Sequence, residues 1–349
     1  EERYGYANTH TFDGIDLLQP RFGFNYVLND NMELRGGAGL YSGGNPNVWL
    51  SNSFSNDGIT NIDTYRGDFD LFSAEIAGEG RLIYDPVQDM YDEVSEANPR
   101  LGREPSTNAV HPDFEIPSEW KFNLGFTWVT DEDYIFQADI IHSRKQDSAQ
   151  IVNVAWDTEN VTYAADGRPV YNYDQVGVDS DGDPVVRHYL KSDLVLTNAQ
   201  QDGKSTTISF AVQKDYDFGL DVNFGYAYNK SEDVTPMSSS VAYSNFTNFA
   251  SSDPLNPGLA TSNFEIPHRF TMSLRYSNEF IDGYATSFSL FASRQQGRPF
   301  SYTFDRINIG EAQYGVYNAL LYIPEVDDPS VTYGPDFDLD AFNEFIDNA

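Results

Sequence analysis

Apolar and polar side chains alternate strictly between Pro20 and Gly44, in the stretch PRFGFNYVLNDNMELRGGAGLYSGG. The polar run Asn29–Asn31 interrupts the alternation, after which the apolar residues return to even positions. A period of two is that of a β-strand with one apolar and one polar face, and an Asn/Asp cluster between two such strands is typical of a hairpin turn. The stretch therefore predicts a β-hairpin. Its apolar series is Phe22, Phe24, Tyr26, Leu28, Met32, Leu34, Ala38 and Leu40.

The same pattern recurs three more times along the chain. It is found in KFNLGFTWVTDEDYIFQADII (121–141), STTISFAVQKDYDFGLDVNFGYAYN (205–229) and RFTMSLRYSNEFIDGYATSFSLFA (269–292). Polar runs place turns at Thr130–Asp133 and at Lys214–Phe218. Together with the first hairpin, these stretches predict eight strands in four hairpins.

The polar faces of these strands carry small and hydroxylic residues such as Gly125, Thr207 and Ser289, whereas the wet face of a soluble sheet usually carries more long charged side chains. The turns within hairpins are short, but long polar segments connect the hairpins: Ser42–Trp120, Ser143–Lys204 and Asn229–His268. Long structureless loops count against a compact soluble sandwich, and short turns on one side with long loops on the other are typical of outer-membrane barrels.

Aromatic rings at the strand ends beside the short turns agree with a membrane interface; they are Tyr26, Trp128, Tyr134 and Tyr276. The predicted fold class is therefore all-β, an antiparallel transmembrane β-barrel that is partial in this chain. Even-numbered strand residues would face lipid and odd-numbered residues the lumen. The predicted lipid-facing residues are Phe22, Phe24, Phe122, Leu124, Phe126, Phe210, Val222, Phe224, Phe270, Met272, Leu274, Phe288 and Leu290.

Composition narrows the function. With 54 acidic against 21 basic residues the net charge is −33, which argues against a nucleic-acid partner because phosphate binding needs clustered Lys and Arg. Cysteine is absent, and the five histidines are scattered without ligand spacing. No hydrolase, zinc-protease or phosphate-loop motif is present, so we expect no catalytic residue, no cofactor and no enzyme activity.

The stretch DSDGDP is a weak candidate for a calcium loop, because Asp179, Asp181 and Asp183 are spaced two apart. It departs from the EF-hand template at Pro184, in the sixth position, and at Leu190, where the closing Glu would stand. A solvated Asp/Gly turn fits the stretch better than a dedicated metal site.

Six blocks of sequence resemble the barrel region of TonB-dependent outer-membrane receptors, specifically the Oar-like group. The blocks are LLQPRFGFNYVLN, LRGGAGLYSGGNPNVWLSNSFSNDG, PDFEIPSEWKFNLGF, IPHRFTMSLRY, GRPFSYTF and FDLDAF, spread from Leu17 to Phe342. The resemblance implies a barrel of about 22 strands filled by an N-terminal plug. It also implies loops that capture an extracellular ligand and a periplasmic TonB box through which the proton gradient of a Gram-negative bacterium drives uptake.

The resemblance covers nearly the whole chain, and we expect residues 1–349 to be part of one barrel domain of such a receptor. A TonB box, plug and N-terminal domain are not found in the sequence, so we expect the chain to be an internal piece of a longer protein. The expected partners are outer-membrane lipid, the periplasmic TonB system through the missing N-terminal segments, and an extracellular ligand of unknown class. The loops containing Trp49 and Trp156 are the candidates for contact with this ligand; for Trp49, packing of its loop against the barrel wall is the alternative.

Two other functions stay open from the sequence alone. One is an outer-membrane adhesion or signalling barrel that transports nothing. The other is a soluble, secreted β-sandwich that binds glycans through its aromatic residues. An acidic mouth would favour neutral glycans, peptides or cations over anionic iron chelates.

Overall fold

The fold is taken from a computed structural model. It describes residues 4–43, 46–55, 107–172, 175–178, 184–186, 193–304, 319–325 and 328–348.

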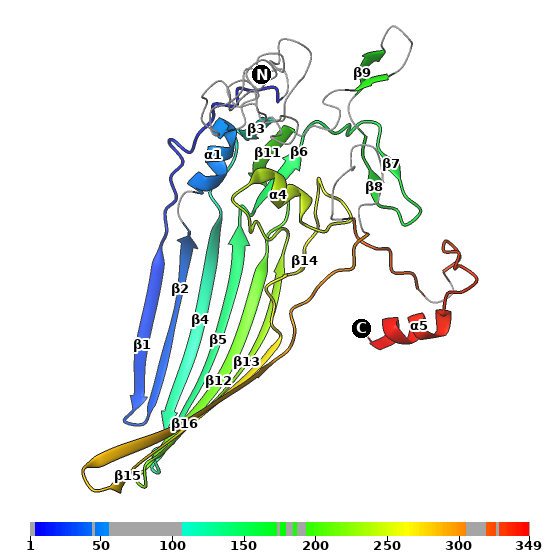
Figure 1. The fold of residues 1–349 in the computed structure, drawn as a ribbon. Helices are drawn as coiled ribbons and strands as arrows, with labels where there is room; N and C mark the ends of the chain where they lie inside the picture. Colours follow the sequence, from blue (N-terminus) through cyan, green and yellow to red (C-terminus); the bar gives the residue numbers. More distant parts are fainter. Residues whose placement is uncertain are drawn as a thin grey trace, which may run out of the picture.

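Eight long strands form one antiparallel sheet in which every strand pairs with its neighbours in chain order (Figure 1). They are β1 (Arg21–Asn29), β2 (Met32–Ser42), β4 (Ser118–Val129), β5 (Ile135–Gln146), β12 (Lys204–Tyr216), β13 (Leu220–Asp233), β15 (His268–Ile281) and β16 (Tyr284–Gln295). The short β14 (Ala260–Thr261) adds to β13. The eight predicted strands and the four hairpins are thereby confirmed.

The third hairpin turn is shorter than the sequence predicts. Lys214 and Tyr216 continue β12 and pair with Val222 and Leu220, so the turn is confined to residues 217–219. Gly219 adopts a φ of +90°, a backbone conformation that residues with a side chain rarely adopt. The prediction of a turn beginning at Lys214 was therefore wrong by three residues, because a charged residue at an even position still fits the strand.

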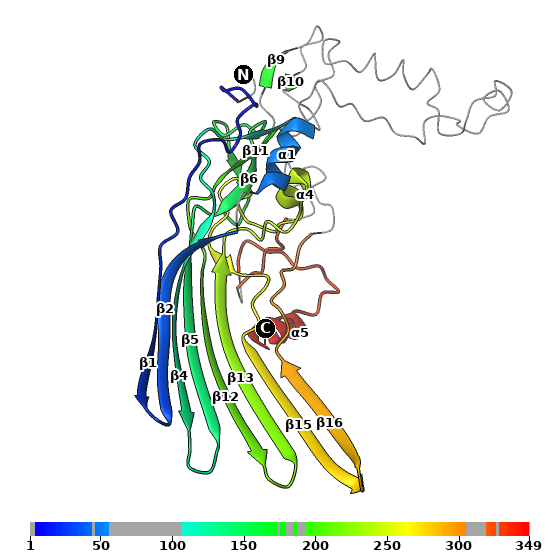
Figure 2. The same ribbon diagram turned by 90° about the vertical axis from the view of Figure 1, so that its left-hand side faces the viewer.

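The sheet is a single curved layer that does not close on itself. Figure 2 shows the strands bending together, with β1 and β16 at the two free edges. Among the described elements, no second sheet covers either face of the eight strands. The soluble β-sandwich considered above was therefore wrong, and the partial barrel is confirmed.

Register keeps even-numbered residues on the same face across all eight strands. One row of directly paired residues runs Leu34, Phe126, Ala138, Phe210, Tyr226 and Phe270. All thirteen predicted lipid-facing residues lie on this even face, and none of them is buried. An apolar face of this extent, left uncovered by the rest of the described chain, is typical of a surface that contacts lipid.

The long connections form a second unit at one end of the sheet, opposite the hairpin turns (Figure 1). We call these two ends the loop end and the turn end. In this unit, β11 (Asp193–Asn198) lies between β3 (Thr107–Val110), to which it is parallel, and β6 (Ala149–Asn153), to which it is antiparallel. Two helices, α1 (Asn47–Ser55) and α4 (Ala242–Thr247), lie beside this small sheet.

This unit, which we call the cap, has a hydrophobic core of its own. Its buried residues include Val110, Phe114, Trp156, Leu194 and Phe246. The expectation of structureless connections was therefore wrong for these parts of the chain, because buried apolar contacts between segments distant in sequence order them.

Shorter elements complete the described structure. They are β7 (Thr162–Tyr163), β8 (Pro169–Val170), β9 (Gln175–Val178), β10 (Pro184–Val186) and α5 (Leu339–Asn348). Within the described part of the chain, none of the helices has the length and apolarity needed to cross a membrane.

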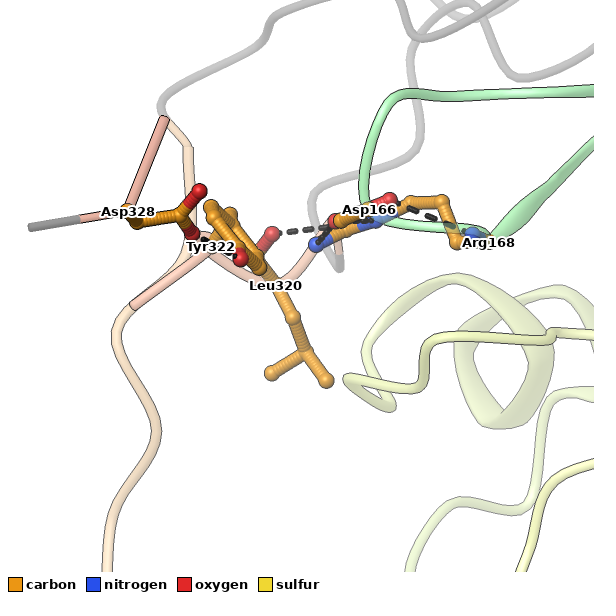
Figure 3. Close-up of polar contacts among 5 residues, drawn as sticks. All are labelled: Asp166, Arg168, Leu320, Tyr322 and Asp328. Carbon is orange, nitrogen blue, oxygen red and sulfur yellow. Dashed lines mark hydrogen bonds and ion pairs between the residues drawn. The ribbon is translucent and has the colours of Figure 1, made fainter. Parts of the chain in front are cut away.

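One contact joins the β7–β8 hairpin to the C-terminal region (Figure 3). Arg168 is paired with Asp166 at 2.6 Å and donates a second hydrogen bond, also of 2.6 Å, to the carbonyl oxygen of Leu320. Nearby, the hydroxyl of Tyr322 donates to Asp328. The bond from Arg168 to Leu320 attaches residues 319–325 to the β7–β8 hairpin, and the bond from Tyr322 to Asp328 lies within the C-terminal region.

Candidate ligand site at the loop end of the sheet

A pocket of about 510 Å³ lies between the cap and the loop end of the sheet. Four long strands, β2, β4, β5 and β13, provide its floor, while α1 and the segment 234–237 provide its walls. Its lining includes Tyr41, Trp49, Glu119, Lys121, Lys145, Asp233 and Met237.

The first wall is α1, which presents Trp49. The indole N–H of Trp49 donates to the carbonyl oxygen of Ser239 at 3.1 Å, and the ring is partly buried against the cap core. The side chain of Asn52, one turn further on, donates to the carbonyl oxygen of Ser240 at 2.8 Å and accepts from the backbone N–H of Ala242 at 3.1 Å. Helix α1 is thus fixed to the segment before α4, and Trp49 is held at the edge of the pocket.

The floor of the pocket is polar, and its charged strand residues are odd-numbered, so they lie on the polar face of the sheet. Glu119 and Lys121, two residues apart on β4, form a salt bridge of 3.1 Å. The ammonium of Lys121 also lies 5.9 Å from the centroid of the Tyr41 ring on β2. Lys145 on the neighbouring β5 lines the same floor.

The far side of the pocket combines a buried acid with apolar groups. Asp233 is 9% exposed and accepts a hydrogen bond of 2.5 Å from the hydroxyl of Ser262. Val234, next to it, is 2% exposed, and Met237 packs against the cap core. The pocket therefore offers two ammonium groups, two carboxylates and an aromatic and apolar wall.

Trp156, the second tryptophan predicted to meet a ligand, lies inside the cap. It is 3% exposed and its ring stacks on that of Tyr171 at 5.5 Å, while Phe246 approaches edge-on at 5.1 Å. Its indole nitrogen is buried without a hydrogen-bond partner in the described part of the chain. This placement supports a packing role, and ligand contact by Trp156 stays a prediction.

Burial in the cap also changes the acidity of a neighbouring group. The hydroxyl of Tyr171 donates to Asp253 at 2.9 Å. Burial, and after it this hydrogen bond to a carboxylate, raise the pKa of Tyr171 above its usual value. Tyr171 therefore stays neutral at physiological pH and serves as a packed hydrogen-bond donor.

The candidate calcium residues Asp179, Asp181 and Asp183 lie outside the described residues. Within the described ranges, no group of three or more His, Asp or Glu side chains is placed to hold a metal ion.

Sequence reasoning identified Trp49 but missed the other residues of the pocket. The spacing of Glu119 and Lys121 could have predicted that they share a site, because two opposite charges two residues apart lie on one face at the end of a strand. Asp233, Val234 and Met237 gave none, because they reach the pocket only through the packing of the cap onto the sheet.

The sheet is a curved layer of strands paired in chain order, with one uncovered apolar face, short turns at one end and a cap at the other. This arrangement is that of the wall of a membrane-spanning β-barrel. Residues 5–335 match the outer membrane beta barrel domain, and the chain belongs to this family. Its location is therefore the outer membrane. The family is one of barrels rather than enzymes, in agreement with the expectation that the chain is not an enzyme.

Solved structures similar to the chain include the outer membrane transporter YddB from Escherichia coli, with a TM-score of 0.41 and 11% identity over 86% of this chain and 32% of that one. The siderophore receptor PirA from Pseudomonas aeruginosa gives a TM-score of 0.34 and 8% identity over 79% of this chain and 34% of that one. PirA from Acinetobacter baumannii gives 0.30 and 12% over 77% of this chain and 36% of that one. The chain thus spans about a third of the length of these structures. No curated protein sequence matches the chain.

Proposed function

We propose that the chain forms part of the barrel wall of a TonB-dependent outer-membrane receptor, which captures a ligand at the loop end and takes it up with energy from the inner membrane. The observation that supports this function most strongly is the pocket beneath the cap. A preformed concave site with an aromatic wall and a few convergent polar groups is what a small-ligand site requires. The order of the six sequence blocks resembling such receptors supports the same function.

In this proposal the even face contacts lipid and the loop end faces the cell exterior, as long loops do in outer-membrane barrels. Aromatic residues on the even face at the turn end fit the opposite interface. There the hydroxyls of Tyr134 and Tyr216 are 3.2 Å apart, and the ammonium of Lys214 lies 5.3 and 5.6 Å from the centroids of their rings. Such rings, apolar at one end and wet at the other, suit the headgroup level.

Further strands complete the barrel in this proposal. β1 and β16 are the edges of an open sheet, and their outward backbone groups would meet lipid unpaired. An unpaired backbone N–H or C=O in hydrocarbon costs several kcal/mol, roughly, so only closed barrels span membranes with strands. The structures reported above are about three times longer, which leaves room for such strands.

The lining of the pocket favours an uncharged or zwitterionic ligand. Glu119 and Asp233 balance Lys121 and Lys145, although the chain as a whole is strongly acidic. Trp49 supplies an indole at the rim, a side chain suited to the apolar face of a sugar or to a peptide side chain. We therefore propose a neutral oligosaccharide or a short peptide as the ligand.

The test uses cells that lack the complete protein and are complemented with the wild type or with Trp49→Ala. The cells receive a defined mixture of neutral oligosaccharides and short peptides, and depletion of each compound from the medium is measured by mass spectrometry. We expect wild-type cells to deplete at least one compound, a protonophore to stop the depletion, and Trp49→Ala to slow it about tenfold or more. Tyr163→Ala, a change at a ring 70% exposed on β7, is the matched control.

Two results would contradict the proposal. Equal depletion by Trp49→Ala and wild-type cells would show that the pocket does not bind the ligand that is taken up. Compounds that bind to the cells but are never depleted would favour an adhesion or signalling barrel instead.

A further inference from the structure

The even face of the sheet carries a net positive charge, in a chain whose net charge is −33. Among the even-numbered residues of the eight long strands, five are Lys or Arg and one is acidic. They are Arg144, Lys204, Lys214, Lys230 and Arg294, with Glu232 as the acid. The face that meets lipid in the proposed function is therefore also the basic face.

Most of this charge lies in one patch at the loop end. Arg144 on β5 stands directly opposite Lys204 on β12, and Thr206, the next even residue of β12, pairs with both His142 and Lys230. We call His142, Arg144, Lys204, Thr206 and Lys230 the cationic patch. Directly paired side chains have Cβ atoms about 4.5–5.5 Å apart, so the members of the patch can reach one small anion together.

The positive charge of the patch is only partly neutralised within the described chain. Lys204 pairs with Glu232 at 3.0 Å, but Arg144 and Lys230 are exposed and form no ion pair with any described residue. Like charges directly opposite each other destabilise a sheet, and Glu232 relieves this repulsion only on the Lys204 side of the Arg144–Lys204 pair. Thr206 adds a hydroxyl, which is bonded to His142 at 2.9 Å.

The position of the patch selects the kind of anion. The next row of the even face toward the turn end is apolar and consists of Ile140, Ile208 and Tyr228. Below it lie Ala138, Phe210 and Tyr226. The patch therefore lies just above a band suited to acyl chains, at the height where charged side chains reach the headgroups of a bilayer.

We propose that the cationic patch binds the phosphate groups of an anionic lipid in the outer leaflet, with its acyl chains along the apolar rows below. This inference rests on the membrane orientation given under the proposed function. Arg144 and Lys230 supply the unneutralised charge, and Arg144 can bind phosphate in a bidentate manner. A soluble anion would gain nothing from the apolar rows.

The test measures binding of diphosphorylated lipid A to the complete protein in detergent by native mass spectrometry. Each cation near an anionic surface contributes about a fivefold gain in affinity, so Arg144→Gln/Lys230→Gln should weaken binding by about 25-fold. Arg269→Gln/Arg275→Gln removes the same charge from the odd face of β15 and should change binding less than about twofold. The conservative pair Arg144→Lys/Lys230→Arg should keep most of the affinity, which a loss of folding would not allow.

Three results would overturn the lipid site. The first is equal binding by the two glutamine double variants. The second is inorganic phosphate alone binding as tightly as lipid A, which would make the patch a site for free phosphate. The third is a change of oligomeric state in Arg144→Gln/Lys230→Gln without loss of lipid, which would make it a protein interface.

A label at Phe210→Cys separates this inference from the orientation on which it rests. Protection of the label from a water-soluble quencher in vesicles, together with unchanged lipid binding by Arg144→Gln/Lys230→Gln, would overturn the lipid site alone. Full access of the quencher to the label would overturn the membrane orientation itself.

Discussion

Arg35 on β2 reaches across β4 to Asp139 on β5, and its Nη2 lies 2.6 Å from Asp139 Oδ1. The residue between them in the register is Gly125, whose lack of a side chain leaves the path open. Nη1 of Arg35 also donates to the hydroxyl of Thr127 at 2.7 Å. Three strands are therefore cross-linked on the polar face through one guanidinium.

This geometry predicts the effect of filling the gap. A Cβ at Gly125 would overlap Asp139 Oδ1 and lie 2.8 Å from Arg35 Nε, so Gly125→Ala would push this ion pair apart and should lower the free energy of unfolding by about 1 kcal/mol. Urea unfolding of the complete protein in vesicles measures this change. Gly23→Ala is the control, because its nearest contact would be Gly36 O at 3.7 Å. Equal stability of the two variants would contradict the role of Gly125.

Lysine substitutions on adjacent residues test which face meets lipid. Leu274→Lys and Phe126→Lys should each destabilise the inserted barrel by about 2–4 kcal/mol if these sites lie near the middle of the membrane. Ser273→Lys, one residue away on the odd face, should cost far less. Assembly in the outer membrane and unfolding in vesicles are the measurements. Normal assembly and wild-type stability of Leu274→Lys would show that the even face does not contact lipid.

The cap should lose its structure when its central ring is removed. Trp156 is stacked on Tyr171 and meets Phe246 edge-on, so Trp156→Ala should destabilise the cap by about 3–5 kcal/mol. Limited proteolysis should then cut the cap and leave the strands intact. Tyr163→Ala removes an exposed ring and should leave the digestion pattern unchanged. A pattern shared by both variants would show that Trp156 does not hold the cap together.

The contact drawn in Figure 3 predicts how residues 319–325 are held. The side chains of Arg168 and Asp166 are 10% and 12% exposed, so Arg168→Ala leaves a nearly buried carboxylate unpaired and removes the bond to Leu320. We expect a loss of about 2 kcal/mol of local stability, seen as faster hydrogen exchange in 319–325. Tyr322→Phe removes only the bond to Asp328 and should accelerate exchange less.

Two aspartates in the cap should respond to pH in opposite ways. Burial, with Asp202 nearby, raises the pKa of Asp147, so its charge destabilises the fold at neutral pH. Asp147→Asn should therefore stabilise the cap at pH 7, and this gain should fade as the pH falls through the raised folded pKa and vanish below the unfolded value of about 4. Asn also suits the φ of +55° at this position.

Asp157 is the control of opposite sign. Hydrogen bonds from the side chain and backbone of Asn160 lower the pKa of Asp157 in the folded protein. The carboxylate of Asp157 therefore stabilises the fold at pH values above its unfolded pKa, and this stabilisation is lost as the pH falls through its folded pKa. Asp157→Asn should thus lower the cap's melting temperature at pH 7 and have little effect in strong acid. The same sign of change in both variants would contradict this account.

The strands were predictable because their signal is local. Alternation fixes the face of each residue from its nearest neighbours, and the hairpin at Asn29–Asn31 needs no information from elsewhere in the chain. The error at Lys214 has the same origin, since hydrophobicity alone cannot tell a lysine within a strand from one in a turn.

The cap was not predictable for the opposite reason. Thr107 pairs with Asp193 in a parallel bridge across 86 residues, and the four-residue strand that begins at Thr107 has no alternation to reveal it. Nor does sequence distinguish the two candidate tryptophans. Trp49 lines the pocket and Trp156 is buried, because α1 lies at the edge of the cap and the segment after β6 runs through its centre.

The even register shared by the eight long strands has a consequence for how the chain tolerates insertions and deletions. The eight long strands of the sheet keep the same parity, although long connections separate the hairpins. Deleting one residue inside a strand would therefore turn apolar rings toward the lumen for the rest of that strand, whereas deleting two would preserve the faces. Length variation in descendants of this gene should thus be free in the connections but restricted to pairs of residues within the barrel wall.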